Sequence, residues 1–373
     1  MQFFYKILQQ IAHILFRIFF KRIFLRHWKD VPAHEPTIIV GNHANAAMEG
    51  ILLSVFYPRP VYLLTRGDLF ANRFVEKMLA FIHLLPIYRQ RDGIGNVQKN
   101  FQIFDTVQRA LKENAVIVIF AEGNCIQEKR LRSLQKGAAR LAFQFAQETA
   151  FQKELFLQPM GINYTYPAHL RGEVMLAAGK AIRLSDYFSL YQENDRKAIT
   201  ALTQNLAENL APEVLQLTPE TEAIFEKTIP TLRKIDDAEK QYCGLVQYQD
   251  VVAGSRLEME QNWANFVQTH SAEAVDTAIK HKKLTVEAAK KGFSLRNFLC
   301  NGFYYVCYLF SLLIFVIPLF FAHFISKAKV KEIEFFNTTR FTLTFLLSLV
   351  FWALVLGWIL MVSLVFRREI GYG

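Results

Sequence analysis

A histidine and a glutamate near residue 45 are the first side chains that could act together in catalysis. His43 follows the apolar run 37–40, which is typical of a buried strand, and Glu49 comes six residues later. A carboxylate at this spacing can fold back onto the imidazole, fix its tautomer and stabilise its protonated form. The pair could then serve as a general base. A core histidine and an unrelated surface glutamate would leave the same spacing, so spacing alone leaves both interpretations open.

Other loops that follow apolar runs carry groups that suit an anionic substrate. Arg89 and Arg91 come directly after the run 86–88, and a guanidinium matches phosphate oxygens with two hydrogen bonds. A solvated basic loop would explain the same two residues. The run 155–162 contains Pro159-Met160-Gly161, brings no titratable group, and is predicted to shape a wall of the site.

The loop at 120–124 follows the clearest buried strand of the sequence, residues 115–120. Glu122 offers a carboxylate, and Gly123 allows backbone N–H groups to approach a ligand closely. A basic run comes next, with members Lys129, Arg130, Arg132 and Lys136. Each signal is weak singly, and their order along the chain is more specific than any one of them.

The apolar pattern between residues 35 and 185 predicts a scaffold that brings these loops together. Strands are predicted at 37–40, 60–64, 86–88, 115–120, 155–162 and 173–177. Helices are predicted at 49–56, 69–82, 97–113 and 135–150. Strands that alternate with helices indicate an α/β layered domain with a largely parallel sheet, in which chemistry gathers at the carboxyl ends of the strands.

Composition and charge limit the function. Hydrophobic residues make up 52% of the 373, with 34 phenylalanines, and the excess lies at the two ends of the chain. The net charge of +10 favours an anionic partner, such as lipid headgroups, a phosphorylated substrate or nucleic acid. The four cysteines have no CxxC spacing, so neither a zinc site nor a disulfide scaffold is expected, and a reducing compartment is favoured.

The segment 1–30 is predicted to be an amphipathic helix at a membrane interface. Polar side chains recur every three or four residues through 1–28, as a stripe on an otherwise apolar helix. A spanning helix would not carry these cations, because each costs about 2.5–3.5 kcal/mol at the membrane centre. A signal peptide is not expected, because the apolar core is interrupted. Packing on the protein's own body is the alternative.

Two apolar segments near the C-terminus, 298–325 and 341–366, each exceed the roughly 20 residues that span a bilayer. They predict a transmembrane hairpin over 297–367, whose connecting segment 326–340 lies across the membrane from the catalytic domain. Seven cations flank the hairpin on the near side, against four in the connecting segment. This excess places the catalytic domain of an integral membrane protein on the cytoplasmic face.

A helical extension is predicted between the α/β domain, 31–185, and the hairpin. Residues 186–296 show helical patterns at 198–210, 218–234 and 251–270, followed by the basic stretch 280–291. No catalytic constellation stands out there. Packing on the α/β domain is the expected role, and binding a partner or forming a channel for the substrate are the alternatives.

In order, these motifs resemble those of the glycerolipid acyltransferase superfamily, over about residues 35–185. Asn42-His43 with Glu49 resembles the first motif, and Asn45 fits a sub-branch with this longer spacing. Arg89 matches the arginine that ends the second motif. The third and fourth motifs resemble Phe120-Ala121-Glu122-Gly123 and Pro159-Met160-Gly161, and the stretch 131–140 looks like the same sub-branch.

Three positions depart from the family's pattern. Glu49 stands where aspartate is usual, but its longer side chain still reaches the imidazole, so activity is expected. Ala121 replaces a proline, which loosens the turn without removing chemistry. Asn124-Cys125 replace the usual Thr-Arg, whose arginine helps to hold the acceptor phosphate. The acceptor is therefore open, and Arg130 or Arg132 could substitute.

The resemblance implies an acyltransferase of phospholipid synthesis with no cofactor and no metal. Acyl-CoA or acyl-carrier protein would be the donor, and a hydroxyl of glycerol-3-phosphate or lysophosphatidate the acceptor. His43 would be the general base and Glu49 would hold its other nitrogen. Contacts to the substrate are expected from Asn42, Asn45, Arg89, Arg91, Glu122, Gly123, Arg132 and Lys136. Cys125 is interpreted as incidental, since no acyl-enzyme is needed.

Two other interpretations stay open. The acceptor hydroxyl could belong to another lysolipid or to an aminolipid, as the missing motif arginine permits. The chain could instead be a non-catalytic lipid-binding relative, in which Glu49 marks a decayed site. Anionic membrane lipids are expected partners. Nucleic acid is not, because it would explain the charge but not the two apolar segments.

Overall fold

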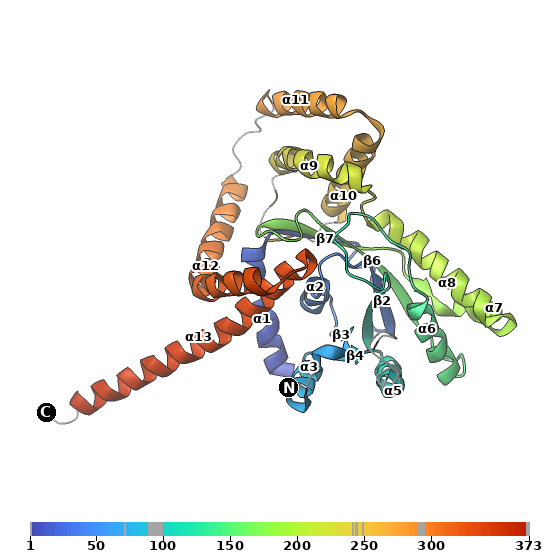
Figure 1. The fold of residues 1–373 in the computed structure, drawn as a ribbon, viewed down its shortest axis with the longest axis horizontal. Helices are drawn as coiled ribbons and strands as arrows, with labels where there is room; N and C mark the ends of the chain where they lie inside the picture. The colour runs from blue at the N-terminus through green and yellow to red at the C-terminus, as the bar shows by residue number, and fades with distance from the viewer. Residues whose placement is uncertain are drawn as a thin grey trace.

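A mostly parallel β-sheet forms the centre of the computed structural model, with helices on both faces (Figure 1). The structure describes residues 2–370 apart from 71, 89–99, 241, 243–244, 248–249 and 289–294. The described strands are β1 Phe20–Arg26, β2 Thr37–Gly41, β3 Val61–Arg66, β4 Leu84–Ile87, β5 Val116–Phe120, β6 Phe156–Tyr164, β7 Gly172–Ala178, β8 Ile182–Arg183 and β9 Val246–Gln247.

The α-helices surround this sheet and continue beyond it. The described helices are α1 Gln2–Phe19, α2 Met48–Phe56, α3 Arg73–Phe81, α5 Asn100–Lys112, α6 Gly137–Glu148, α7 Phe188–Glu193, α8 Asp195–Leu210, α9 Pro219–Lys240, α10 Asp250–Thr269, α11 Ala272–Ala288, α12 Leu295–Lys329 and α13 Ile333–Ile370. The α/β class and the largely parallel sheet predicted from the sequence are confirmed.

The strand order β4-β3-β5-β2-β6-β7-β1-β9 places β2 at the centre of the sheet. β2 pairs in parallel with β5 on one side and β6 on the other, and all its residues are buried. Gly41, its last residue, lies opposite Phe120 of β5 and Met160 of β6. β2 and β5 therefore end together and release their loops at one edge, where the predicted site residues follow, while β6 continues to Tyr164.

The prediction of one helix through residues 1–28 is wrong after Phe19. Residues 20–26 form β1, which pairs in parallel with β7 inside the sheet. The cations of this segment suggested a polar helical stripe, but ion pairs within the protein neutralise them. The Nζ of Lys21 and the Nη1 of Arg22 lie 2.7 and 2.6 Å from the Oδ2 of Asp237. A partner more than 200 residues away leaves no local signal.

Three hydrophobic cores hold the layers together. One lies between the sheet and α1 and α2, and includes Phe16, Phe19 and Leu52. The second lies on the opposite face, under α5, α6 and α8. The third joins β1 and β7 to α9, α10 and α11. The predicted packing of residues 186–296 on the α/β domain is thus observed for the residues that the structure describes.

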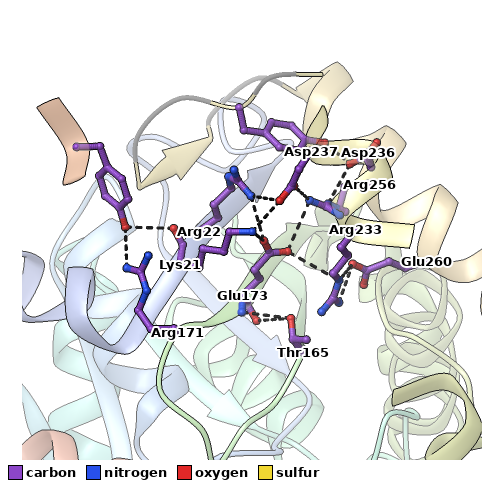
Figure 2. Close-up of polar contacts among 12 residues, drawn as sticks. Lys21, Arg22, Thr165, Arg171, Glu173, Arg233, Asp236, Asp237, Arg256 and Glu260 are labelled. Carbon is purple, nitrogen blue, oxygen red and sulfur yellow. Dashed lines mark hydrogen bonds and ion pairs between the residues drawn. The ribbon is translucent and has the colours of Figure 1, made fainter. Parts of the chain in front are cut away.

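A buried ion network also attaches the helical extension to the sheet (Figure 2). Arg256 of α10 is fully buried, and its guanidinium lies 3.2 Å from Asp236, 2.6 Å from Asp237 and 3.6 Å from Glu173 of β7. Burial alone would lower the pKa of Arg256, but these carboxylates outweigh it and raise the pKa. Removing one member would leave an uncompensated buried charge, at a cost of about 3–5 kcal/mol.

The C-terminal helices α12 and α13 form an apolar hairpin. Residues 301–329 and 333–361 are each 29 residues long and apolar enough to cross a membrane, by length and composition. The expected position of the connecting segment is wrong, because 326–340 lies against the α/β domain. Thr338 donates a hydrogen bond to Asn45 O over 2.7 Å, and Arg340 donates to Ala168 O over 3.3 Å. The comparison of cations on the two sides of the hairpin therefore no longer indicates on which side of a membrane the α/β domain lies.

The two halves of the hairpin differ in how they meet the domain. Tyr304 of α12 donates to Lys21 O over 3.2 Å, and Phe341 of α13 lies 5.0 Å from Phe16 and Phe19 of α1, between ring centroids. The C-terminal half of α13 extends away from the rest of the molecule (Figure 1), and many of its apolar side chains are exposed. Exposed apolar surface of this size marks a membrane or partner contact.

Candidate active site

Asn42 anchors the loop that leaves β2. Its Nδ2 donates to Ile162 O over 2.9 Å, and its Oδ1 accepts the Ile162 N–H over 2.8 Å. The side-chain amide thus continues the pairing of β2 with β6 by one more step. Asn42 is buried and both its polar groups are used, so it supports the loop and presents the next residue, His43, at the edge of the sheet.

The structure brings His43 and Glu49 together. The Nδ1 of His43 lies 3.5 Å from the Oε2 of Glu49, and the Glu49 side chain is fully buried while that of His43 is 18% exposed. The other carboxylate oxygen, Oε1, accepts the N–H of Ala44 over 3.0 Å and the N–H of Asn45. Glu49 lies in the first turn of α2, where the helix dipole favours a negative charge. A buried carboxylate is therefore aimed at an imidazole that solvent can reach.

Phe120 holds the face of the His43 ring, a role that the sequence did not reveal. The two rings stack with centroids 4.6 Å apart and planes inclined by 6°. Phe120 closes β5, beside Gly41 of β2, so the pairing of the two strands sets the stack. Its place at the head of the Phe-Ala-Glu-Gly motif was the available signal.

Glu122 and Arg132 form hydrogen bonds with the loop that carries His43. Glu122 Oε2 accepts the His43 N–H over 2.9 Å, and Oε1 accepts the Arg132 N–H over 2.8 Å. The Arg132 guanidinium lies 2.6 Å from Glu122 Oε2, and it also donates to His43 O and Asn124 O. Gly123 has φ 81°, in the left-handed region that favours glycine. Glu122 and Arg132 thus hold the loop that carries His43, and the charge of Arg132 is already paired with Glu122.

The remaining predicted cations lie elsewhere. Lys136 precedes α6, and its Nζ donates to Thr200 Oγ1 of α8 over 2.8 Å. Arg130 pairs with Glu128, with Nε 2.8 Å from Oε2. Arg89 and Arg91 lie outside the described residues. Within the part of the chain that the structure describes, no group of three or more His, Cys, Asp and Glu could hold a metal ion.

The peptide bond between Asn45 and Ala46 is held at both ends. Thr338 of α13 donates to Asn45 O over 2.7 Å, and the Ala46 N–H donates to Cys125 Sγ over 3.0 Å. These two hydrogen bonds matter because Ala46 has a φ of 50°, which is an unfavourable region for a residue with a side chain. Asn45 itself is buried, and its Nδ2 donates to Pro167 O over 3.0 Å. Asn45 thus serves the loop, and no local pattern could have pointed to Thr338.

Cys125 is a structural acceptor. Burial and the nearby charge of Glu49 raise the pKa of its thiol to about 12. A thiol that stays protonated at neutral pH is a poor nucleophile. This agrees with the interpretation of Cys125 as incidental to the chemistry.

A cavity of about 310 Å³ opens beside Asn42 and Ala44. The helical extension and the hairpin complete its wall, through Glu222 and Glu226 of α9 and Glu334 of α13. Lys129 also lines it, and its Nζ bonds Glu226 and lies 3.1 Å from Glu222. Four glutamates, these three and Glu128, face one lysine among the lining residues, so the cavity is acidic.

Comparison with known proteins finds acyltransferases. Residues 22–163 match the family model described as Acyltransferase. The 1-acyl-sn-glycerol-3-phosphate acyltransferase of Bacillus subtilis (strain 168) is 25% identical over 188 residues, which cover 48% of this chain and 84% of that protein. The crystal structure of the 1-acyl-sn-glycerophosphate (LPA) acyltransferase PlsC from Thermotoga maritima has a TM-score of 0.39 and 15% identity, over 55% of this chain and 78% of that chain. The matched region contains every motif described above, so the α/β domain of this chain is similar to the acyltransferases in the residues and the order of its motifs.

Proposed function

We propose that this protein transfers a fatty acyl group from acyl-CoA or acyl-carrier protein to a hydroxyl of lysophosphatidate or glycerol-3-phosphate at a membrane. The observation that carries the proposal is the His43–Glu49 pair at the carboxyl end of β2, with 3.5 Å between Nδ1 and Oε2. The name of the Bacillus subtilis relative supports 1-acylglycerol-3-phosphate, which is lysophosphatidate, as the first acceptor to test.

The proposal gives each nitrogen of His43 a role. Nδ1 faces Glu49, so Nε2 is the atom that accepts the proton of the acceptor hydroxyl. As the hydroxyl oxygen bonds to the thioester carbonyl carbon, the imidazolium forms beside a carboxylate that stabilises it. Collapse of the tetrahedral intermediate breaks the C–S bond, and the proton passes from Nε2 to the leaving thiolate. General base catalysis of this kind contributes on the order of 10²–10⁴-fold.

The acceptor phosphate needs cations that are not already engaged. Arg132 is bonded to Glu122 and Arg130 to Glu128, so neither is a strong candidate. We therefore keep Arg89 and Arg91 as the first candidates in the α/β domain, since they follow β4 in the sequence and β4 pairs in parallel with β3, the neighbour of β5.

One observation favours a second acceptor class. The cavity beside Asn42 and Ala44 is lined by four glutamates and one lysine. Such a wall favours an ammonium group over a phosphate. A lysolipid or aminolipid with a cationic headgroup is therefore the alternative acceptor.

The proposed location is the cytoplasmic face of a membrane. The hairpin of α12 and α13 supports membrane association by its length and composition, and acyl thioesters are cytoplasmic donors. No cofactor and no nucleic acid enter the proposal, and anionic lipids remain the proposed membrane partners.

The test uses the full chain in lipid nanodiscs. Labelled acyl-CoA or acyl-carrier protein is supplied with lysophosphatidate, glycerol-3-phosphate or lysophosphatidylethanolamine. The expected result is transfer to one acceptor by the wild-type protein and a loss of 10²-fold or more in His43→Ala. If His43→Ala transfers as fast as the wild type, the mechanism is wrong. A wild-type protein that binds these lipids and acylates none of them would instead be a non-catalytic relative.

A further inference from the structure

A second cavity lies where the hairpin turn meets the α/β domain. It has a volume of about 560 Å³ and is formed by residues 168–170, the turn 330–332 and the ends of α12 and α13. Its lining carries Lys331, Arg340, His169 and His323, against one carboxylate, Glu332. Its charge is therefore opposite to that of the acidic cavity beside Asn42.

Arg340 is the unusual member of this lining. It is only 5% exposed, and its Nη2 donates to Ala168 O over 3.3 Å and to Asn337 Oδ1 over 2.6 Å. Its Cζ lies 5.5 Å from the ring centroid of Phe19 and 5.2 Å from that of Phe336. All four partners are uncharged. Among the residues that the structure describes, none accepts from its Nε and no carboxylate pairs with it.

Arg256 is another buried arginine of this chain and provides a comparison for Arg340. That side chain is fully buried and has three carboxylates within 3.6 Å. A buried charge is costly unless a charge of opposite sign accompanies it. Arg340 faces a cavity instead of a carboxylate, so its counter-charge would come from a ligand.

The surroundings indicate the kind of anion. Ile333 of α13 lines the cavity and is exposed, and the exposed Phe324 of α12 lies beside the lining residue His323, with ring centroids 5.7 Å apart. Apolar side chains around a basic pocket suit a molecule with an anionic head and acyl tails. Arginine and lysine together are typical of phosphate recognition.

We propose that this cavity, called the turn pocket below, binds the phosphate of a glycerolipid through Arg340 and Lys331. The lipid is either a resident anionic phospholipid or the acceptor itself. Only the second source rests on the proposed function, because phosphate binding requires no acyl transfer. Thr338, two residues from Arg340, bonds Asn45 O, so an occupied turn pocket also stabilises the contact between α13 and the His43 loop.

The first experiment measures binding without turnover. Full-length protein in detergent micelles is titrated with phosphatidate or diacylglycerol, and bound lipid is counted by native mass spectrometry. Phosphatidate is expected to bind at least tenfold more tightly than diacylglycerol. Lys331→Gln should weaken phosphatidate about fivefold. Arg340→Gln should weaken it about 10- to 100-fold.

Lys329→Gln is the matched control, because Lys329 is an exposed lysine that ends α12 and does not line the turn pocket. It should bind phosphatidate as the wild type does. Lys331 is also exposed, so its substitution tests the site even if Arg340→Gln fails to fold. Equal binding by Lys331→Gln and Lys329→Gln, or no preference for phosphatidate over diacylglycerol, would overturn the proposal.

Two further arms separate the sources of the phosphate. In neutral phosphatidylcholine nanodiscs, a Lys331→Gln protein with a raised KM for lysophosphatidate identifies the acceptor as occupant. An unchanged KM, with weaker stimulation by added phosphatidylglycerol, identifies a resident lipid. His43→Ala should keep wild-type phosphatidate binding while transfer is lost. If the wild type transfers no acyl group, the proposed function fails while the binding result still decides the turn pocket.

Discussion

Glu49 approaches His43 with one oxygen and holds the loop with the other. Oε2 lies 3.5 Å from Nδ1, while Oε1 accepts the backbone N–H groups of Ala44 and Asn45. The same carboxylate therefore orients the ring and fixes the segment that carries it. The longer side chain and the longer loop belong together, because an aspartate at position 49 would reach less far into this turn.

Substitutions at Glu49 separate its charge from its length. Glu49→Gln keeps an oxygen for the backbone but cannot stabilise an imidazolium, so kcat should fall on the order of 10²–10⁴-fold. Glu49→Asp keeps the charge and should lose less. Steady-state transfer to lysophosphatidate measures both. An inactive wild type that becomes active as Glu49→Asp would indicate a decayed site.

Arg132 is predicted to matter for stability and Arg130 is its control. Arg132→Met leaves the buried Glu122 carboxylate without its cation and should cost about 3–5 kcal/mol of unfolding free energy. Arg130→Met breaks a largely exposed pair with Glu128 and should cost about 0–1 kcal/mol. Thermal unfolding of both proteins provides the measurement. Equal losses would show that Glu122 does not depend on Arg132.

Thr338 and Thr344 lie on the same helix, and both are buried, but their hydroxyls bond different partners. Thr338 donates to Asn45 O in the His43 loop, and Thr344 donates to Arg340 O in its own helix. Thr338→Val should therefore lower kcat about tenfold, with Thr344→Val within twofold of the wild type. Hydrogen exchange of residues 42–48 should rise only in Thr338→Val. A common loss in both would assign the effect to the helix.

Gly161 is predicted to be irreplaceable for the docking of the helical extension. A Cβ at this position would lie 2.1 Å from Glu213 O, so Gly161→Ala must push the two backbones apart, at about 1–3 kcal/mol. Gly137 has nothing within 4 Å of such a Cβ, and Gly137→Ala should stay within about 0.5 kcal/mol. Chemical denaturation compares the two. The family motif Pro-Met-Gly thus has a packing reason here.

Acid should loosen the extension through Asp237. Burial would raise the pKa of this carboxyl, but Arg22, Lys21 and Arg256 outweigh burial and lower it. A carboxyl with a depressed pKa stabilises the fold above its unfolded pKa, about 3.9, and this contribution is lost as pH falls through the folded value. Hydrogen exchange of α10 should therefore rise below about pH 4. In Asp237→Asn, the hydrogen exchange of α10, measured relative to that of α6, should be the same at pH 3.5 and at pH 6.

Local patterns predicted the parts of the fold that depend on neighbours in sequence. The apolar runs 37–40 and 115–120 became β2 and β5 because both strands are central and largely buried. The approach of Glu49 to His43 was also within reach, since one turn of chain separates them. β1 was missed because its cations find Asp237 and Glu173 only in the folded chain.

The sequence predicted the approach of Glu49 to His43, but not the groups that hold their loop in place. Glu122 and Arg132 were expected to contact a substrate, but both form hydrogen bonds with the backbone of His43. Thr338 and the glutamates of α9 come from parts of the chain that carried no motif. Such contacts depend on how elements distant in the sequence pack together, and the spacing of residues along the chain does not reveal that.

The junction of α1 and β1 has a mechanical consequence. The helix ends at Phe19 and the strand begins at Phe20, with no residue between them to act as a hinge. Any movement of α1 is therefore passed directly to β1 and, through the pairing of β1 with β7, to the sheet that presents His43.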